Sequence, residues 1–268
     1  MIKKLNKLSF LLLLIVLLTG CTSQKPKNRL TVGASSIPHA EILRHIKPAL
    51  KKEGIDLEIK VFNDYVLPNA ALDAEELDAN YYQHIPYMNK SNKDNGYDLV
   101  SAGKIHLEPL GLYSKRVKKI SDVKNGATVL VSSSRADWGR VLSILEQNGI
   151  LTLKPGTNIE TADFKDIKDN PKNLKFKYSF DPKILPELYK NDEGDLIAIN
   201  SNFAVQAKID PKSAVAIEST DSPYSNVVAV NKSDKNKKNI ELLVRELKKD
   251  STQKWILKKW KGAVLPVK

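Results

Sequence analysis

Short apolar runs alternate with longer amphipathic stretches along most of the chain. The short runs predict strands at 30–34, 57–62, 99–102, 128–131, 174–178, 196–199, 214–217 and 227–230. The stretches with helical spacing predict helices at 38–53, 84–95, 136–148, 202–208 and 236–259. Strands that alternate with helices are typical of α/β layers and argue against a helical bundle or a β-sandwich. We therefore expect an α/β protein built on sheets.

The first 20 residues follow a different pattern. Lys3, Lys4 and Lys7 precede an apolar run at 8–18, and small residues follow that run. These are the three parts of a secretory signal peptide, and the run is too short to span a bilayer. The sequence LTGC, which ends at Cys21, resembles the lipobox of bacterial lipoproteins. In that motif the cysteine thiol receives a lipid and becomes the new N-terminus.

We accordingly expect a signal peptide at 1–20 and a lipid on Cys21, which is the only cysteine in the chain. A lipidated cysteine cannot form a disulfide, so stability has to come from packing. Residues 21–28 are polar and contain Pro26, so they are expected to form the anchor and a short tether. The predicted location is the extracytoplasmic face of the cell membrane. The alternative is a plain secretory signal that happens to contain a cysteine.

The chain has 268 residues and a formal net charge of +12, of which the three lysines of the signal peptide supply a part. This length permits one large domain or two of ordinary size. A basic excess can indicate nucleic-acid binding, but an exported protein does not meet nucleic acid, so no such partner is expected. Attraction to an anionic envelope is the preferred interpretation.

The polar residues contain no catalytic or metal-binding motif. The four histidines are His39, His45, His84 and His106. His39 and His45 are six residues apart, which places them on different faces of a helix, and no H-E-x-x-H, C-x-x-C or acidic calcium loop occurs. The serine run at 132–134 lies in no G-x-S-x-G motif, and no phosphate-binding glycine loop is present. Neither an enzyme, a metal site nor a cofactor is therefore expected.

Two segments are rich in aromatic and amide side chains. They are FNDYVLPN at 62–69 and NYYQHIPY at 80–87. Aromatic side chains with polar tips make good walls for a small amphipathic ligand. For any single tyrosine, core packing is the simpler interpretation, so the clustering of several is what indicates a binding site.

With these segments in view, the chain from residue 30 to the C-terminus resembles the methionine-binding lipoproteins of ABC importers. The similarity lies in FNDYVLPN (62–69), YYQHIPY (81–87), HLEPLGLYS (106–114), NPKNLKF (170–176), AINSNFA (198–204) and DSPYSNVVAV (221–230). The sequence PHAEIL at 38–43 is similar to the Gram-positive members. Several matches in the same order are a much stronger indication than any one of them.

The resemblance implies a type II periplasmic-binding-protein fold, in which two α/β lobes are joined by a two-segment hinge and enclose a ligand cleft. The first lobe is expected to comprise 29–109 and 228–268, and the second lobe 110–227. The chain is expected to cross between the lobes near 109–112 and 223–228. The implied function is to capture L-methionine or a close derivative and deliver it to an ABC permease and its ATPase. No cofactor is implied.

The resemblance also assigns binding residues. Arg140 matches the arginine that holds the ligand carboxylate, a task that suits a planar guanidinium with two parallel donors. Asn200 and Asn226 match the amide positions that contact the amino and carboxylate groups of the ligand. The remaining matches would enclose the thioether side chain, where sulfur gains from contact with ring edges: Tyr65, Tyr82, Tyr87 and His84.

One segment departs from the family pattern. The common members have a Pro-Asn-Asp-Pro-Thr-Asn-like loop before the arginine, whereas this chain has SSSRADW at 132–138. We expect this loop to line the pocket at the carboxylate end, to be looser without its prolines, and to be altered by the bulk of Trp138 and the charge of Arg135. Three alternatives therefore remain. The ligand could be a methionine-containing dipeptide or another apolar amino acid, or the protein could be an envelope adhesin without a transport role.

Overall fold

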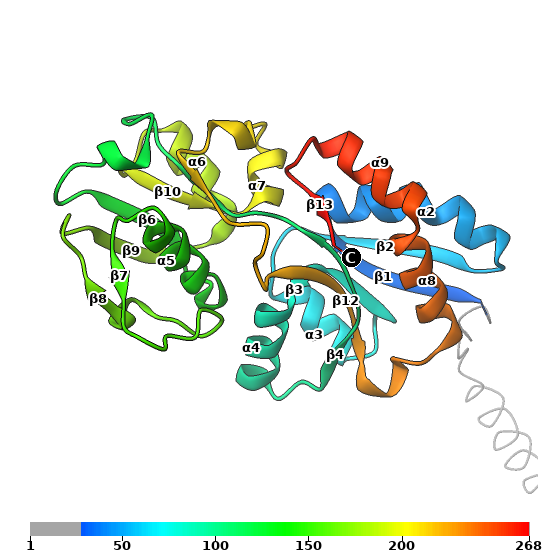
Figure 1. Cartoon of the computed structure of the whole chain (residues 1–268). Helices are drawn as coiled ribbons and strands as arrows, with labels where there is room; N and C mark the ends of the chain where they lie inside the picture. Colours follow the sequence, from blue (N-terminus) through cyan, green and yellow to red (C-terminus); the bar gives the residue numbers. More distant parts are fainter. Residues whose placement is uncertain (1–27, 268) are drawn as a thin grey trace, which may run out of the picture.

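The computed structural model describes residues 28–267 and has two α/β lobes that lie side by side (Figure 1). The first lobe contains a six-stranded sheet with the order β13-β4-β12-β3-β1-β2, and the second contains a five-stranded sheet with the order β11-β5-β10-β6-β9. The predicted two-lobed α/β fold is therefore confirmed. The predicted signal peptide, Cys21 and all but the last residue of the tether lie outside the described residues.

The first lobe is formed by two separate parts of the chain. Its strands are β1 (Arg29–Ser35), β2 (Asp56–Phe62), β3 (Ala79–His84), β4 (Leu99–Leu107), β12 (Ser225–Asn231) and β13 (Leu265–Pro266). Its main helices are α2 (Glu41–Lys52), α3 (Leu67–Asp73), α4 (Ile85–Asn95), α8 (Lys238–Lys248) and α9 (Asp250–Trp260), and a π-helical turn, η1 (Ser36–Ala40), follows β1. Helix α2 buries Ile42, Ile46 and Leu50, which share one face at helical spacing, in the core of this lobe.

The second lobe is continuous in sequence. Its sheet contains β5 (Gly111–Tyr113), β6 (Thr128–Ser132), β9 (Lys175–Phe180), β10 (Leu196–Ile199) and β11 (Ala216–Ile217), and β7 (Thr152–Leu153) pairs separately with β8 (Ile167–Asp169). Its helices include η3 (Arg135–Asp137), α5 (Trp138–Gln147), α6 (Leu185–Lys190) and α7 (Ser201–Gln206). Helix α5 packs Val141, Leu142 and Leu145 into the core of this lobe.

Several elements differ from the sequence prediction. Strand β3 was not predicted, because all six of its residues are buried and a strand buried on both faces lacks an alternating pattern. The short elements α3, β5 and α6 were also not predicted. The helix predicted at 236–259 is two helices, since Lys249 has an extended backbone between α8 and α9. The helix predicted from residue 38 begins as an α-helix only at Glu41.

Two segments connect the lobes, at 108–110 between β4 and β5 and at 218–224 between β11 and β12. The predicted return to the first lobe at residue 228 is too late, because β12 begins at Ser225. Asn226 already pairs with His84 of β3 and His106 of β4. The apolar run begins only at Val227, whereas Ser225 and Asn226 are polar but already pair with β4.

The direction of the strands places the carboxyl edge of each sheet at the region between the two lobes. Strands β1, β2 and β3 are parallel, and β4 runs in the same direction because both β3 and β4 are antiparallel to β12. In the second lobe β6, β9 and β10 are parallel. The carboxyl ends of parallel strands lie at the same edge of a sheet, which is where ligands bind in open α/β sheets. A site between the lobes is therefore favoured by topology alone.

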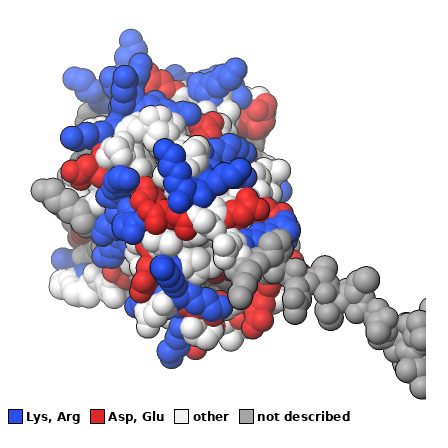
Figure 2. Space-filling view, turned by 90° about the vertical axis from the view of Figure 1, so that its right-hand side faces the viewer, with Lys and Arg blue, Asp and Glu red and all other residues white. Residues whose placement is uncertain are grey.

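The surface of the first lobe carries charges of both signs. Figure 2 shows Lys and Arg side chains over this face, with Asp and Glu side chains between them. Such a mixture is typical of a solvated surface and not of a continuous basic track for nucleic acid. Among residues 28–267, no helix has the length and apolar character needed to cross a bilayer.

Candidate ligand-binding site

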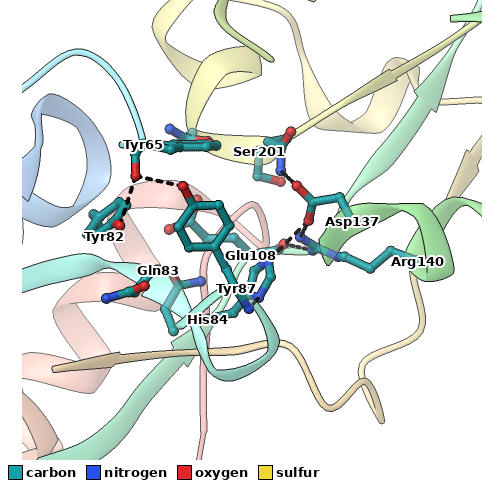
Figure 3. A pocket seen from close by; sticks show the side chains of 12 residues that line it. Tyr65, Tyr82, Gln83, His84, Tyr87, Glu108, Asp137, Arg140 and Ser201 are labelled. Carbon is teal, nitrogen blue, oxygen red and sulfur yellow. Dashed lines mark hydrogen bonds and ion pairs between the residues drawn. The ribbon is translucent and has the colours of Figure 1, made fainter. Parts of the chain in front are cut away.

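A pocket that is partly open to solvent lies between the two lobes (Figure 3). All seven residues predicted from the sequence line it: Tyr65, Tyr82, His84, Tyr87, Arg140, Asn200 and Asn226. The other lining residues are Gln83, Glu108, Asp137, Ser201 and Asn202. Most of them lie at or just after the carboxyl ends of β2, β3, β4, β6 and β10, so the sheet topology brings these distant segments together.

One end of the pocket is aromatic. The ring centroids of Tyr65, Tyr82 and Tyr87 are 6.0–6.1 Å apart, and Phe203 lies 5.1 Å from Tyr65. The hydroxyls of Tyr82 and Tyr87 donate to the backbone carbonyl of Tyr65 at 2.9 and 2.8 Å. These bonds fix the rings and satisfy the hydroxyls. The enclosed surface is consequently suited to an apolar group.

The opposite end is charged, with Arg140 at its centre. This side chain is 3% exposed. Its Nε donates to both carboxylate oxygens of Glu218 at 3.0 and 3.1 Å, and its Nη2 donates to Glu218 and to the carbonyl of Glu108. Nη1 donates to Oδ1 of Asp137 at 3.1 Å. Among the described residues these bonds engage four of the five guanidinium N–H groups.

This geometry changes what Arg140 has available for a ligand. The parallel donor pair that the sequence prediction assigned to a ligand carboxylate is directed at Glu218, and one N–H of Nη1 remains. Burial opposes the charge of Arg140, but the adjacent carboxylates of Glu218 and Asp137 hold its pKa above the usual value. Arg140 is therefore a buried cation that is already paired inside the protein.

Asp137 is the second charged group in the pocket wall and is 2% exposed. Its Oδ1 accepts from Nε2 of His84 at 3.0 Å and from Arg140, and its Oδ2 accepts from Nδ2 of Asn200 at 3.3 Å. Burial alone would raise the pKa of Asp137, but the hydrogen bonds that it accepts from His84 and Arg140, together with the charge of Arg140, bring it well below its ordinary value. Asp137 is therefore an anion, and two carboxylates share the single charge of Arg140.

His84 links the two lobes. Its Nδ1 accepts from the backbone N–H of Tyr87 at 3.1 Å at the start of α4, so the ring proton is assigned to Nε2, which donates to Asp137 of the second lobe. A second link joins the hydroxyl of Tyr65 to Oδ1 of Asn202 at 2.7 Å. Side chains from opposite lobes thus contact one another at the pocket.

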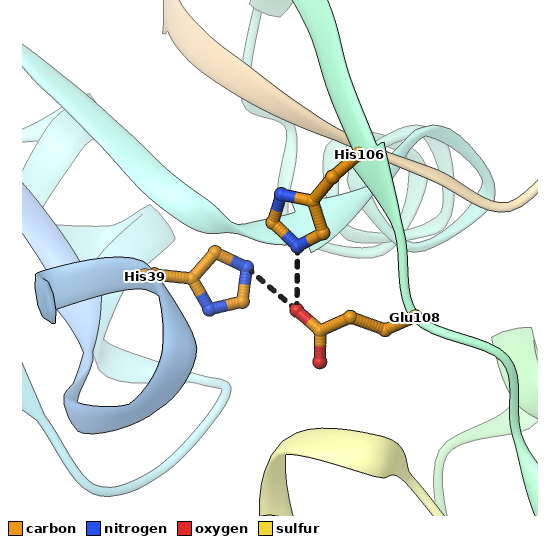
Figure 4. Close-up of side chains that lie close together, drawn as sticks. All are labelled: His39, His106 and Glu108. Atoms are coloured by element: carbon orange, nitrogen blue, oxygen red, sulfur yellow. Dashed lines mark hydrogen bonds and ion pairs between the residues drawn. The ribbon is translucent and has the colours of Figure 1, made fainter. Parts of the chain in front are cut away.

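Behind the pocket lies a buried cluster of two histidines and one glutamate (Figure 4). Nε2 of His39 and Nε2 of His106 lie 3.1 and 2.7 Å from the same oxygen of Glu108. The Nδ1 atoms contact the hydroxyls of Ser35 and Tyr81, respectively. Burial lowers the pKa of His39 to about 4 and that of His106 to about 3, and it raises the pKa of Glu108.

Sequence spacing could not reveal this cluster. His45 stacks on Trp255 with ring centroids 4.0 Å apart, while His39 faces His106, which comes from another strand. The ligand-type atoms of His39, His106 and Glu108 all lie within 4.8 Å of one another. However, hydroxyls at the outer nitrogens and a carboxyl oxygen at the inner ones satisfy both rings without an ion. That the protein holds no metal stays a prediction.

The divergent loop at 132–138 does not contribute to the pocket in the way that the sequence predicted. Trp138 does not line the pocket; it packs against Phe164 and Tyr178 in the second lobe, and its indole N–H donates to the carbonyl of Ser132 at 2.9 Å. Arg135 is exposed and pairs with Asp163 at 2.8 Å. The expectation that Trp138 and Arg135 alter the pocket is therefore wrong.

The same loop does reach the pocket through another residue. A 3-10 turn at Arg135–Asp137, with the amide of Asp137 bonded to the carbonyl of Ser134 at 3.0 Å, orders the backbone in place of the missing prolines. The only pocket-lining residue of this segment in the described chain is Asp137. Its position directly before α5, three residues from Arg140, was the signal in the sequence that could have identified it.

Other pocket residues also escaped the sequence analysis. Glu108 and Asn202 lie inside quoted motifs but were not given a role, and Glu218 was not singled out. Glu218 forms its contacts with Arg140 across 78 residues of sequence. No local pattern indicates such a pair, because it depends on how the second crossing segment passes α5.

Two α/β lobes, two connecting segments and a pocket between the carboxyl edges of their sheets are typical of the solute-binding proteins. The NlpA lipoprotein family matches residues 30–268, and the chain belongs to this family. The predicted family is thereby confirmed. The methionine-binding lipoprotein MetQ of Bacillus subtilis is 43% identical over 276 residues, which cover 99% of each chain.

Solved structures give the same result. A protein of Enterococcus faecalis V583, described as a pheromone cOB1 precursor/lipoprotein of the YaeC family, has a TM-score of 0.86 and 52% identity, and the match covers 89% of this chain and 100% of that one. A nutrient binding protein from Burkholderia cenocepacia, solved bound to methionine, has a TM-score of 0.83 and 36% identity with the same coverage.

Proposed function

We propose that this protein is a lipid-anchored solute-binding protein that captures L-methionine outside the cell membrane and delivers it to an ABC importer. The observation that carries the proposal is a single pocket with a tyrosine triangle at one end and Arg140 with Asp137 at the other. An apolar amino acid likewise has an apolar side chain at one end and charged amino and carboxylate groups at the other. The names of the Bacillus and Burkholderia relatives support methionine among such amino acids.

The ligand side chain would lie among Tyr65, Tyr82 and Tyr87, where sulfur gains from contact with ring edges. The ligand carboxylate would lie toward Arg140, which contributes its charge and one N–H, with Asn226 as a further donor. Side chains of both lobes line the pocket, so a small ligand could contact the two lobes at once.

Ligand capture would be coupled to lobe closure. The crossing segments at 108–110 and 218–224 would serve as the hinge, and the contacts of Tyr65 with Asn202 and of His84 with Asp137 would form when the lobes close. A closed form differs in shape from an open one, so a permease with its ATPase could distinguish loaded from empty protein. A lipid on Cys21 would keep the protein at the membrane where the permease lies.

Native mass spectrometry of the full-length lipoprotein, purified in detergent without added ligand, tests the proposal. We expect a bound mass equal to methionine, and a thermal shift on adding methionine to protein stripped of ligand. A heavier adduct matching a methionine dipeptide would replace the free amino acid with the peptide as the ligand. Bare protein that responds to neither compound would overturn the proposal and favour the adhesin alternative.

A further inference from the structure

We infer that Asp137 is the acceptor for the ammonium group of the ligand, so that the site takes small apolar compounds with a free amine and rejects their N-acylated forms. This inference rests on the proposed function and narrows its substrate class. It assigns to Asp137 a role in specificity that is separate from the pairing of Arg140. Figure 3 shows Asp137 on the same side of the pocket as Arg140 and across from Tyr65 and Tyr82.

The first argument is the hydrogen-bonding capacity of Asp137. A carboxylate offers about four acceptor positions. Oδ1 uses two of them for His84 and Arg140, whereas Oδ2 has a single bond of 3.3 Å from Asn200, which is long for an N–H donor. Among the described residues, Oδ2 therefore retains capacity for a stronger hydrogen-bond donor. Because Asp137 lines the pocket, a ligand could supply that donor.

The second argument is charge. Asp137 and Glu218 together face one guanidinium, and all three side chains are at most 7% exposed. A buried carboxylate without full compensation is costly. A ligand ammonium beside Asp137 would offset the charge of this carboxylate locally, while the carboxylate of the same ligand would lie toward Arg140. A ligand with a carboxylate and no amine would instead bring a further negative charge into the same space.

The third argument is that several other acceptors in the pocket wall are already engaged. Oδ1 of Asn202 accepts from Tyr65, Oδ1 of Asn226 contacts His39, and Oε1 of Gln83 accepts from Asn69. Glu108 also lines the pocket, but one of its oxygens faces the two histidines behind it. Asp137 is the carboxylate of the described pocket wall that lies beside Arg140 and keeps an acceptor position available to a ligand.

The test is calorimetry at pH 7 on the full-length lipoprotein in detergent with four ligands. L-methionine is compared with N-acetyl-L-methionine, and 3-(methylthio)propylamine is compared with 3-(methylthio)propanol, which has the same size and no charge. We expect the acetyl compound to bind about 100-fold more weakly than methionine, and the alcohol at least about 10-fold more weakly than the amine.

The variant Asp137→Asn keeps the shape of the side chain and removes its charge. We expect methionine to bind this variant about 10- to 100-fold more weakly, and the preference for the amine over the alcohol to disappear. Asp192→Asn is the matched control, because Asp192 pairs with Arg116 on the surface and its side chain is 51% exposed. That variant should keep both preferences unchanged.

The outcomes distinguish a failure of the role inferred for Asp137 from a failure of the proposed methionine binding. If wild-type protein binds methionine and N-acetyl-L-methionine within about threefold of one another, or the amine and the alcohol equally, the inference is overturned and the methionine function stands. An unchanged preference in Asp137→Asn also overturns it. If wild-type protein binds no methionine, the function and the inference fall together. The comparison of amine and alcohol on wild-type protein tests the preference for a free amine even if the variant does not fold.

Discussion

Nε2 of His39 lies 3.1 Å from Oδ1 of Asn226, although 187 residues separate the two in sequence. The hydroxyl of Ser35 is 2.6 Å from Nδ1 of His39, and burial keeps the ring neutral because it lowers the pKa of His39 to about 4. When Ser35 donates to Nδ1, Nε2 carries the proton and donates to Asn226. The amide orientation of Asn226, and with it the donor that it offers to the pocket, thus depends on a histidine that does not line the pocket.

We expect His39→Leu to weaken methionine binding about 5- to 10-fold, because the amide of Asn226 loses the bond that orients it. Calorimetry measures this loss. The matched control is His106→Leu, which removes from the same cluster a ring that is bonded to Glu108 and Tyr81 and not to the amide of Asn226. Both variants should lower stability by about 1–3 kcal/mol through the loss of buried hydrogen bonds. An equal loss of affinity in the two variants would contradict the orienting role of His39.

Arg140→Met should lower the free energy of unfolding by about 3–5 kcal/mol, because Asp137 and Glu218 would stay buried without their cation. Adding Glu218→Gln should restore part of the loss, since it removes one of the uncompensated charges. Urea titrations of the single and double variants measure the coupling. Strictly additive effects would show that the ion pair has no energetic role.

The same change at Arg140 should weaken methionine binding by about 2–4 kcal/mol, because the ligand carboxylate would lose a charged partner in a buried site. Calorimetry on folded variant protein measures this effect. A change in affinity of less than about threefold would exclude Arg140 as a carboxylate contact.

Tyr65→Phe removes the hydroxyl that bonds to Asn202 across the pocket and leaves the ring in place. We expect affinity to fall about 3- to 10-fold, because one contact that holds the lobes together is lost. The apolar wall should be unaffected, so the preference for methionine over alanine should persist. Tyr178→Phe is the control, because Tyr178 is 47% exposed and lies outside the pocket. Wild-type affinity in Tyr65→Phe would exclude a role for this contact in closure.

The buried histidines predict a dependence of stability on pH. Burial lowers the pKa of His39 to about 4 and that of His106 to about 3, from 6.5 in the unfolded chain. Below pH 6.5 the unfolded state therefore takes up protons that the folded state does not. The free energy of unfolding should fall between pH 6.5 and about 4, by up to about 3 kcal/mol for each ring. Glu108 opposes part of this fall, because its pKa is raised and the folded state protonates it first.

Thermal unfolding between pH 7.5 and 4 measures this effect. His106→Asn should show a smaller decrease over the same range, because it removes one of the two groups whose pKa is lowered. The comparison is made within each protein, so a general loss of stability in the variant does not affect it. A decrease of equal size in both proteins would assign the pH dependence to other groups.

The α/β class and several elements could be predicted from local patterns. The apolar spacing in α2 and α5 reflects a single buried face for each helix, and such a pattern can be recognised in the sequence. Strand β3 could not be found in this way, because it is buried on both faces. The start of β12 was misplaced because its first two residues, Ser225 and Asn226, are polar and do not belong to the apolar run that follows.

The seven predicted pocket residues were found because their motifs resemble a known family, and the structure places all of them around one pocket. Their partners were not found. The sequence suggested that Trp138 and Arg135 would shape the site, but the side chain of Asp137 between them is the one that reaches it. Which residue of a loop faces a pocket depends on the backbone turn there, and residue type alone does not reveal it.

The sequence by itself therefore determined the layers of the fold, the lipobox-like N-terminus and the segments that supply the pocket, because these depend on residues close together in the chain. The tertiary structure decided the pairing of Arg140 with Glu218, the position of Asp137 and the link from His39 to Asn226. These contacts join residues from separate elements, and they exist only because strand direction and register bring the elements to the same edge. The charge balance of the pocket follows from those contacts, so it is a property of the folded chain and not of any local motif.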